Sequence, residues 1–250
     1  MSVVIYIEHT EGTVKKNALE AASYAVEYAE KTGSTAIGVA IGNVSEDEIK
    51  KVGTVGLSKV IKVDGHNYLN HQKVAAILAD IANTQDATTI IFAGSSEGKA
   101  AGPRLAIKLS ASVISEVVGT PSSTAPITVK KKCFSGKGLA NVELSSDKNV
   151  IIISTNGFGV HEKISDCTIE ITSSAASDDS IKHVSFDRNT EGISLPDAEL
   201  VVSAGRGLKG AENWGMIDEL AASLDAATAC SKPVSDIGWR PHHEHVGQTG

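Results

Sequence analysis

Aromatic residues are scarce in this chain. It has two Trp, four Tyr and four Phe in 250 residues, or 4%, whereas hydrophobic residues as a whole make up 41%. The cores must therefore be built from Val, Ile, Leu and Ala, which suits parallel sheets buried beneath helices. A chain of this length can bury one large core or two modest ones, and we expect two domains.

Cysteine and the usual catalytic motifs are also scarce. Cys133, Cys167 and Cys230 are isolated, with no C-x-x-C pairing, so the sequence indicates neither a disulfide framework nor a zinc ribbon. The three histidines within residues 242–245 lie in a proline-containing loop without a fourth ligand at a familiar spacing, and we expect them at the surface. No H-E-x-x-H or evident pair of carboxylates in an apolar pocket occurs, so catalysis by side chains is not indicated.

Cations are outnumbered, with 23 Lys and Arg against 30 Asp and Glu and a formal net charge of −7. This balance argues against nucleic acid as a partner, and the short basic run Lys130–Lys132 fits a solvated sheet face. No hydrophobic run is long enough to span a bilayer, so we do not expect membrane insertion. The N-terminus lacks a signal-like basic stretch and an Arg/Ser-rich leader, which favours a soluble protein of the bacterial cytoplasm.

Strand-like and helical patterns alternate in the first half. The apolar runs are Val3–Ile7, Thr35–Ile41, Val60–Val63 and Thr88–Ala93. Helical stripes lie between them, from Ala18 to a helix end near Gly33 and from Val74 to Ile81, and Ser45 with Glu48 forms a capping-box pattern. This alternation predicts a right-handed parallel α/β sheet.

The loop Gly94–Lys99 is the candidate site of the first half. It leads from the carboxyl end of a predicted parallel strand into a helix that carries Arg104 and Leu105, where open α/β sheets usually bind ligands. It lacks the full G-x-x-x-x-G-K-[ST] pattern, so we favour a polar connecting loop over a bound phosphate.

After Val118 the pattern changes to short β-like runs separated by Ser, Gly, Asn and Asp, which predicts an antiparallel extension. The runs are Ile127–Lys131, Leu139–Leu144, Val150–Ser154, Asp166–Ile171 and Ile181–Phe186. Phe158–Lys163 is expected as a surface loop and Ser173–Ser180 as an exposed connection. We place the domain boundary at Gly192–Pro196, with domains at 1–192 and 197–250.

A glycine-rich stretch follows the boundary. The apolar run Leu200–Ala204 leads into Gly205, Gly207 and Gly210, which match G-x-G-x-x-G. A helical stripe then contains Trp214, Ile217, Leu220 and Ala221. The next strand, Ala226–Cys230, ends in Ser231 and Lys232 and not in the acidic residue that an NAD-binding Rossmann site would want. One strand, one helix, a second strand and a long loop cannot cover a sheet, so we expect an incomplete Rossmann-like domain that needs further chain or a partner.

Several motifs in this half carry a resemblance to a known family. They are Gly205-Arg206-Gly207-Leu208-Lys209, Glu212-Asn213, Ser231-Lys232-Pro233, Asp236-Ile237-Gly238-Trp239 and Val246-Gly247-Gln248-Thr249-Gly250. In this order they resemble the FAD domain of the electron transfer flavoprotein alpha subunit, and the N-terminal half is similar to that family's first domain. Members normally continue past the Gln-Thr-Gly with further strands and helices.

The resemblance implies a set of cofactor-binding residues. They are Arg206, Ser231, Lys232, Val246, Gly247, Gln248 and Thr249. Arg206 would lie beside the cofactor in the glycine turn, and Ser231 would donate a hydrogen bond to it. Lys232 stands where most members place an arginine near the flavin ring; it keeps the positive charge but loses the planar guanidinium, so we expect an altered potential. Residues 246–249 would grip the ring and the ribityl or phosphate portion.

The resemblance also implies a function. It is that of an electron transfer flavoprotein alpha subunit, an electron carrier and not an enzyme. Non-covalent FAD would carry electrons from acyl-CoA dehydrogenases of fatty acid beta-oxidation, and from similar flavoprotein donors, to a membrane quinone oxidoreductase. The partner would be a beta subunit in a heterodimer, with AMP only in that subunit. The alternatives are a nitrogen-fixation-type or electron-bifurcating paralogue, and a flavin-free module that only docks on the beta subunit.

Overall fold

The computed structural model describes residues 1–66, 69–174, 181, 184–185, 195 and 198–247. The chain divides into two compact units, Met1–Val184 and Ser185–Gly250. The sequence-based boundary at Gly192–Pro196 and the expected strand Ile181–Phe186 lie for the most part outside the described residues, as does the expected connection Ser173–Ser180 beyond residue 174. No helix in the described parts is long and apolar enough to cross a membrane.

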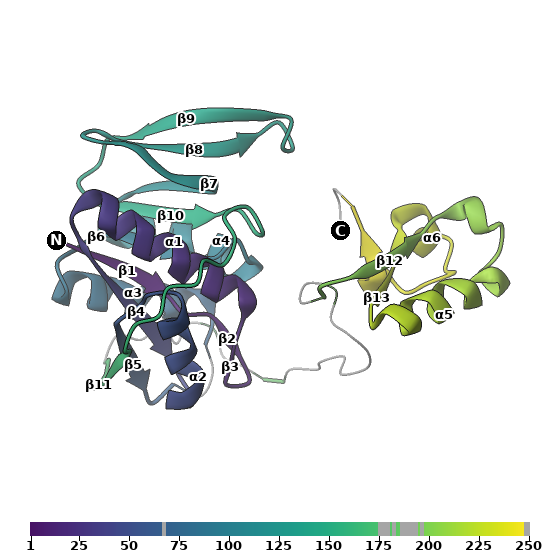
Figure 1. Cartoon of the computed structure of the whole chain (residues 1–250), viewed down its shortest axis with the longest axis horizontal. Helices are drawn as coiled ribbons and strands as arrows, with labels where there is room; N and C mark the ends of the chain where they lie inside the picture. Colours follow the sequence, from purple (N-terminus) through teal and green to yellow (C-terminus); the bar gives the residue numbers. More distant parts are fainter. Residues whose placement is uncertain (67–68, 175–180, 182–183, 186–194, 196–197, 248–250) are drawn as a thin grey trace. The chain divides into compact units, whose positions relative to one another are not determined.

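Unit 1 is built on a nine-stranded sheet with the order β11-β5-β4-β1-β6-β10-β7-β8-β9 (Figure 1). The strands are β1 (Ser2–Tyr6), β4 (Thr35–Ile41), β5 (Lys59–Asp64), β6 (Ala87–Phe92), β7 (Ser112–Thr124), β8 (Ile127–Cys133), β9 (Gly138–Leu144), β10 (Asn149–Ile153) and β11 (Thr168–Ser173). A separate hairpin pairs β2 (His9–Thr10) with β3 (Thr13–Val14). Strand pairs from β11 to β7 are all parallel, and β7-β8 and β8-β9 are antiparallel.

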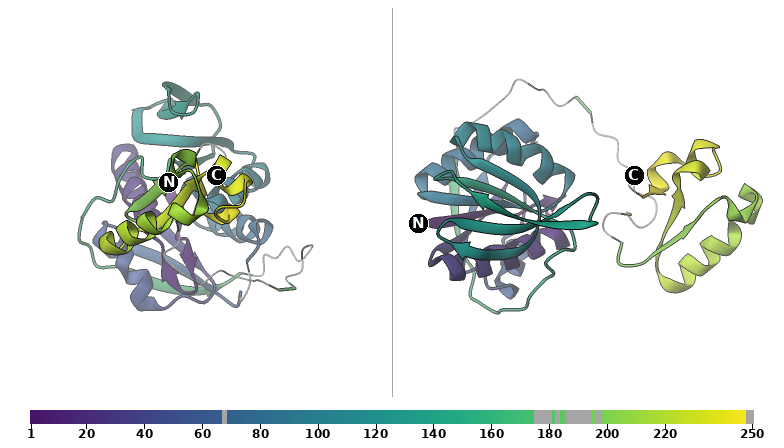
Figure 2. Two further views of the ribbon diagram at one scale, coloured as in Figure 1. Left: turned by 90° about the vertical axis from the view of Figure 1, so that its right-hand side faces the viewer. Right: turned by 90° about the horizontal axis from the view of Figure 1, so that it is seen from above.

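Helices cover both faces of this sheet. The longer ones are α1 (Lys16–Thr32), α3 (His71–Thr84) and α4 (Ser96–Leu109), and α2 (Glu46–Lys50) is short. Alternate residues of β1 enter two different cores: Val3 and Ile5 pack with α1, whereas Val4 and Tyr6 pack with α3 and α4. Figure 2 shows the sheet between α1 on one side and α3 with α4 on the other. The predicted parallel α/β architecture is therefore confirmed.

The helix ends follow the local sequence. The Ser45 hydroxyl accepts a hydrogen bond from the Glu48 backbone N–H at 3.3 Å, as the capping-box pattern predicted. Gly33 ends α1 in the left-handed conformation, with φ of 65°, which glycine adopts without steric cost.

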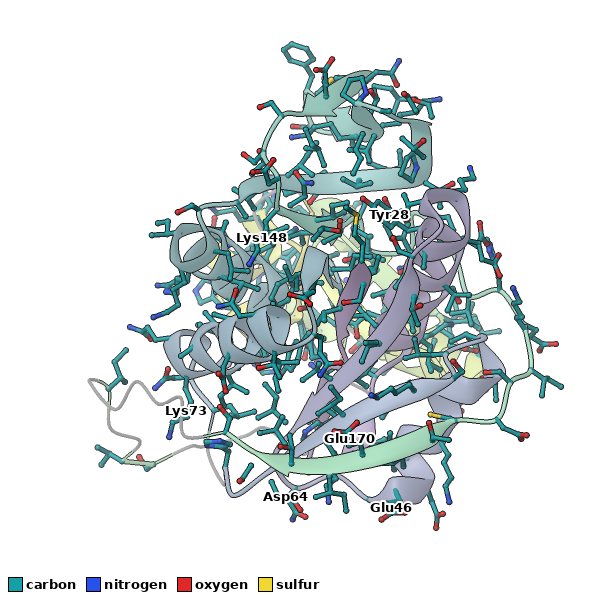
Figure 3. The ribbon with its side chains drawn as sticks, turned by 90° about the vertical axis from the view of Figure 1, so that its left-hand side faces the viewer. Tyr28, Glu46, Asp64, Lys73, Lys148 and Glu170 are labelled. Carbon is teal, nitrogen blue, oxygen red and sulfur yellow. The ribbon has the colours of Figure 1, made fainter. Side chains whose placement is uncertain are left out.

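Two runs assigned to the antiparallel extension belong instead to the parallel sheet. Val150–Ser154 corresponds to β10, which is fully buried and lies between β6 and β7, parallel to both. Asp166–Ile171 corresponds largely to β11, which runs parallel to β5 at the edge of the sheet, where Figure 3 labels Glu170. Short strands of either direction have the same local pattern, and the direction is set by which distant strand they pair with.

The antiparallel extension itself consists of β7, β8 and β9. The sequence patterns missed β7, although it has 13 residues. It contains Gly119, Pro121 and several Ser, which are poor strand formers, and it is irregular at Glu116, whose φ is 60°. Its buried residue Val117 joins the core beneath α1, which ties the extension to the main sheet.

Unit 2 has a three-stranded parallel sheet with the order β12-β13-β14. Its elements are β12 (Val201–Ala204), α5 (Gly215–Leu224), β13 (Ala227–Ser231), α6 (Lys232–Asp236) and β14 (His245–Val246), with single 3₁₀ turns at Arg206–Leu208, Ala211–Asn213 and His242–Glu244. Trp214, Cys230 and Val234 form its small core. Leu220, expected on the buried face of the helix, is 49% exposed, and Ala221 is the one residue of α5 that is buried.

Candidate cofactor-binding site

The carboxyl ends of the three strands of unit 2 meet at one edge of its sheet. Parallel pairing sets Ala204 opposite Cys230 and Ser231 opposite Val246. The segments that leave these strands therefore begin side by side, and a Cβ placed on Gly205 would lie 3.5 Å from the Ser231 hydroxyl oxygen. In open α/β sheets this edge is the usual place for a ligand.

The glycine motif forms a compact turn at this edge. Gly205 is extended, residues Arg206–Leu208 form a 3₁₀ turn, and Lys209 is left-handed with φ of 67°. The Leu208 N–H donates to the Gly205 carbonyl at 3.2 Å, and the Asn213 side-chain amide donates to the Leu208 carbonyl at 2.8 Å. The space beside Gly207 is open, so a ligand can approach its backbone. Two 3₁₀ turns separate β12 from α5, so the motif does not lead directly into the helix.

Three cationic side chains at this edge have no carboxylate partner. Arg206, Lys209 and Lys232 are exposed, and none forms an ion pair with a described residue. Arg240, by contrast, is held by Glu244 through bonds of 2.6 and 2.7 Å and lies over the Trp214 ring. Unpaired cations on one edge produce a positive local field, which attracts an anionic group such as a phosphate.

The Ser231 hydroxyl is also available. Ser231 precedes α6 in the N-cap position, but its side chain makes no capping hydrogen bond. Val246 and Gly247 follow at the end of β14, where Gly247 has φ of 132°. The structure thus brings Arg206, Ser231 and Lys232 to one edge with these two residues. Gln248 and Thr249 lie outside the described residues.

This donor set fits a phosphate-containing cofactor. An open glycine turn offers backbone N–H groups, Ser231 offers an uncommitted hydroxyl, and the three cations offer charge-assisted hydrogen bonds. Within the parts of the chain that the structure describes, no group of three or more His, Cys, Asp or Glu side chains could hold a metal ion.

The corresponding edge of unit 1 carries carboxyl groups where the edge of unit 2 carries cations. In the loop Gly94–Lys99, the Ser95 hydroxyl accepts from the Gly98 N–H at 3.0 Å and donates to the Glu8 carboxylate at 2.5 Å. Glu8 is 2% exposed and pairs with Lys15 at 2.8 Å, and the Tyr6 hydroxyl donates to Glu97 at 3.1 Å. Two carboxyl groups at this position disfavour a bound phosphate.

Sequence reasoning missed this carboxyl pair. Glu8 comes directly after the apolar run Val3–Ile7, and Glu97 comes four residues after the run Thr88–Ala93. The two strands are neighbours in the sheet. Had their adjacency been assumed, the position of each glutamate after its strand would have placed both at one edge.

Two family models match the sequence. The Electron transfer flavoprotein domain matches residues 3–179, and the Electron transfer flavoprotein FAD-binding domain matches residues 194–250.

Curated relatives match over most of the chain. An electron transfer flavoprotein subunit alpha from Pseudomonas aeruginosa is 29% identical, over 100% of this chain and 80% of the relative. A mitochondrial electron transfer flavoprotein subunit alpha from Dictyostelium discoideum is 31% identical, over 89% of this chain and 67% of the relative. A probable mitochondrial subunit alpha from Cryptococcus neoformans is 28% identical, over 100% of this chain and 73% of the relative. The chain therefore belongs to the electron transfer flavoprotein alpha subunit family.

Proposed function

We propose that this chain holds non-covalent FAD at the positive edge of unit 2 and acts as the electron-carrying subunit of an electron transfer flavoprotein. The observation that carries the proposal is the convergence of Arg206, Ser231 and Lys232 at the carboxyl ends of β12 and β13, where none of the three side chains has a hydrogen-bond or ion-pair partner among the described residues. The match of residues 194–250 to an FAD-binding domain supports the same assignment.

Each residue has a distinct role in this proposal. Arg206 and the backbone of the glycine turn bind the anionic part of the cofactor, and the Ser231 hydroxyl donates a hydrogen bond to it. Val246, Gly247, Gln248 and Thr249 hold the ring and the ribityl or phosphate portion. When bound, FAD supplies the redox chemistry, which the protein tunes but does not perform.

Lys232 tunes the potential in this proposal. Its ammonium lies at the edge as a compact point charge, which favours any cofactor state that carries additional negative charge. It cannot form the bidentate or stacked contacts of an arginine, so the ring is held less rigidly at this position.

The wider assignment follows the family. The chain pairs with an electron transfer flavoprotein beta subunit and receives electrons from acyl-CoA dehydrogenases and similar flavoproteins. It passes them to a quinone oxidoreductase and is a carrier without side-chain catalysis. AMP belongs to the beta subunit. The buried Glu8 at the edge of unit 1 agrees with this, because a carboxyl group there disfavours a bound phosphate in this chain. The proposed domains are 1–192 and 197–250, and the proposed location is the bacterial cytoplasm.

The test is the visible absorption spectrum of the chain after co-purification with its beta subunit. We expect about one equivalent of flavin per heterodimer and lower flavin content in Arg206→Gln and Ser231→Ala variants. Lys108→Gln is the matched control, because Lys108 is an exposed cation of unit 1. A colourless heterodimer would refute FAD binding by this chain and favour the flavin-free docking module. A second flavin in place of AMP would favour the bifurcating paralogue.

A further inference from the structure

Two acidic side chains lie close together at the carboxyl edge of the sheet in unit 1. Glu8 follows β1, and Glu97 is the second residue of α4, which follows the neighbouring strand β6. Tyr6, which is 3% exposed, is close to both carboxyl groups, since each of them raises the pKa of its phenol. Neither glutamate belongs to the proposed cofactor site, so their role is a separate question.

The two glutamates differ in the hydrogen bonds that they accept. Glu8 is satisfied on both oxygens: Oε1 accepts from the Lys15 ammonium at 2.8 Å and Oε2 accepts from the Ser95 hydroxyl at 2.5 Å. From the described residues, Glu97 accepts one bond, on Oε1 from the Tyr6 hydroxyl at 3.1 Å. Ion pairing to a cation and full hydrogen bonding stabilise a carboxylate, whereas a half-buried carboxylate with one neutral donor is less well stabilised. If one proton is present, it therefore resides on Glu97.

One local effect opposes this assignment. Glu97 lies in the first turn of α4, where the helix dipole favours a negative charge. This effect is typically worth less than about 1 kcal/mol at a surface, whereas burial beside a like charge shifts carboxyl groups by several pKa units. Burial and the Glu8 carboxylate raise the pKa of Glu97 from 4.5 to about 7, against smaller lowering effects of the Tyr6 hydrogen bond and of Lys15.

Among the described residues, other charged or titratable groups lie on the elements that pack around this edge. Lys15 is the cation already paired with Glu8, and Lys99 lies two residues after Glu97 on α4, where it pairs with Glu116 at 3.0 Å. The first turn of α3, which packs along α4, carries His71 and Lys73, and Figure 3 labels Lys73. Burial and the Glu8 carboxylate have the largest effects on the pKa of Glu97.

We infer that Glu8 and Glu97 form a proton-binding pair that holds one proton on Glu97 near neutral pH and releases it at higher pH. Release places two negative charges at one sheet edge, one on the buried Glu8 and one on the half-buried Glu97, and their repulsion weakens the packing of the first turn of α4. Unit 1 thus contains a pH-sensitive element at the edge where α/β sheets commonly bind ligands.

The direction of the linkage follows from the raised pKa of Glu97. A carboxyl group whose pKa is higher in the folded state contributes stability that is fully present below pH 4.5 and is lost as the pH rises through about 7. Because each pKa unit corresponds to a factor of ten, the unfolding equilibrium constant should rise by up to about a hundredfold between pH 5 and pH 8 from this residue alone.

The test is an NMR titration of the glutamate side-chain carboxyl carbons in the full chain, assigned with Glu97→Gln, together with unfolding curves at pH 5 and pH 8. Glu97 should titrate near pH 7. The Glu97→Gln variant should show a smaller difference in stability between pH 5 and pH 8 than the unmodified chain. Asp47→Asn is the matched control. Asp47 is also the second residue of a serine-capped helix, but it is exposed.

Two further variants separate a proton-binding pair from a structural role. Tyr6→Phe removes a hydrogen bond that lowers the pKa of Glu97, so the titration should move to higher pH. Glu8→Gln removes the neighbouring negative charge, so the titration should move to lower pH. Titration of Glu97 near pH 4.5, or a pH dependence of unfolding in Glu97→Gln equal to that of the unmodified chain, would overturn the inference. Equal titration curves in the unmodified chain and in Glu8→Gln would overturn the pairing.

Discussion

Replacement of Glu20 should destabilise unit 1 through the loop that follows β10. Glu20 lies on α1 and is 3% exposed. Its carboxylate accepts three backbone N–H bonds, from Phe158 and Gly159 on Oε1 and from Asn156 on Oε2, each at 2.9 Å. A single side chain thus satisfies most of the donors of one turn, in a setting where an unpaired buried N–H is costly.

The magnitude follows from these bonds. Hydrogen bonds to a charged acceptor are worth about 1.5–3 kcal/mol each, but partial relaxation and water entry reduce the sum, so Glu20→Ala should cost about 3–5 kcal/mol. Glu20→Gln keeps one oxygen for two of the bonds but turns an NH₂ donor toward the third N–H, so it should cost about 1–3 kcal/mol.

Urea unfolding followed by circular dichroism would measure both losses. Hydrogen exchange would show whether the amides of residues 156, 158 and 159 lose protection. Glu27→Gln is the control, because Glu27 pairs with His161 of the same loop from an exposed position and should cost less than about 1 kcal/mol. If Glu20→Gln is no more destabilising than Glu27→Gln, the three bonds do not hold the loop.

Three further substitutions test other parts of the structure. Trp214→Ala should unfold much of unit 2, at a cost of about 3–5 kcal/mol, because Trp214 is 4% exposed. Trp214→Phe should cost far less, because the indole N–H has no hydrogen-bond partner in the described part of the chain. Thermal unfolding would measure both losses. Gly98→Ala should destabilise by more than about 1 kcal/mol in urea unfolding, although alanine is the better helix former, because the new Cβ would lie 2.1 Å from the Ala93 carbonyl oxygen. Lys232→Gln should lower the reduction potential of bound flavin in a spectroelectrochemical titration, and Lys232→Arg should change it less, because only the first removes the positive charge.

The strands and helices of unit 1 that repeat a local pattern could be predicted from the sequence. Val3–Ile7, Thr35–Ile41 and Thr88–Ala93 are apolar because parallel strands are buried on both faces, so composition alone identifies them. Their order in the sheet is less local. The strand β10 enters between β6 and β7 after a long excursion through β8 and β9, and no pattern within residues 149–153 specifies those neighbours.

The candidate cofactor site could likewise be predicted from the sequence only in part. The motif residues Arg206, Ser231 and Lys232 could be selected from the sequence, because the family resemblance assigns them. Their proximity depends on the register that sets Ala204 opposite Cys230, which only the structure supplies. Glu212 and Asp236 lie close to these cations in the sequence, so only the structure shows that no described carboxylate pairs with them.

The two units show that the sheet edge alone does not decide what is bound there. In both units the carboxyl ends of neighbouring parallel strands meet at one edge of a sheet. Glu8 and Glu97 lie at the edge of unit 1, and the Lys15 ammonium neutralises part of their negative charge. At the edge of unit 2 lie Arg206 and Lys232, neither of which forms an ion pair with a residue that the structure describes. Of these two edges, the second therefore offers the unpaired cations, so the residues that directly follow the strands, and not the topology, set the charge that each edge presents to a ligand.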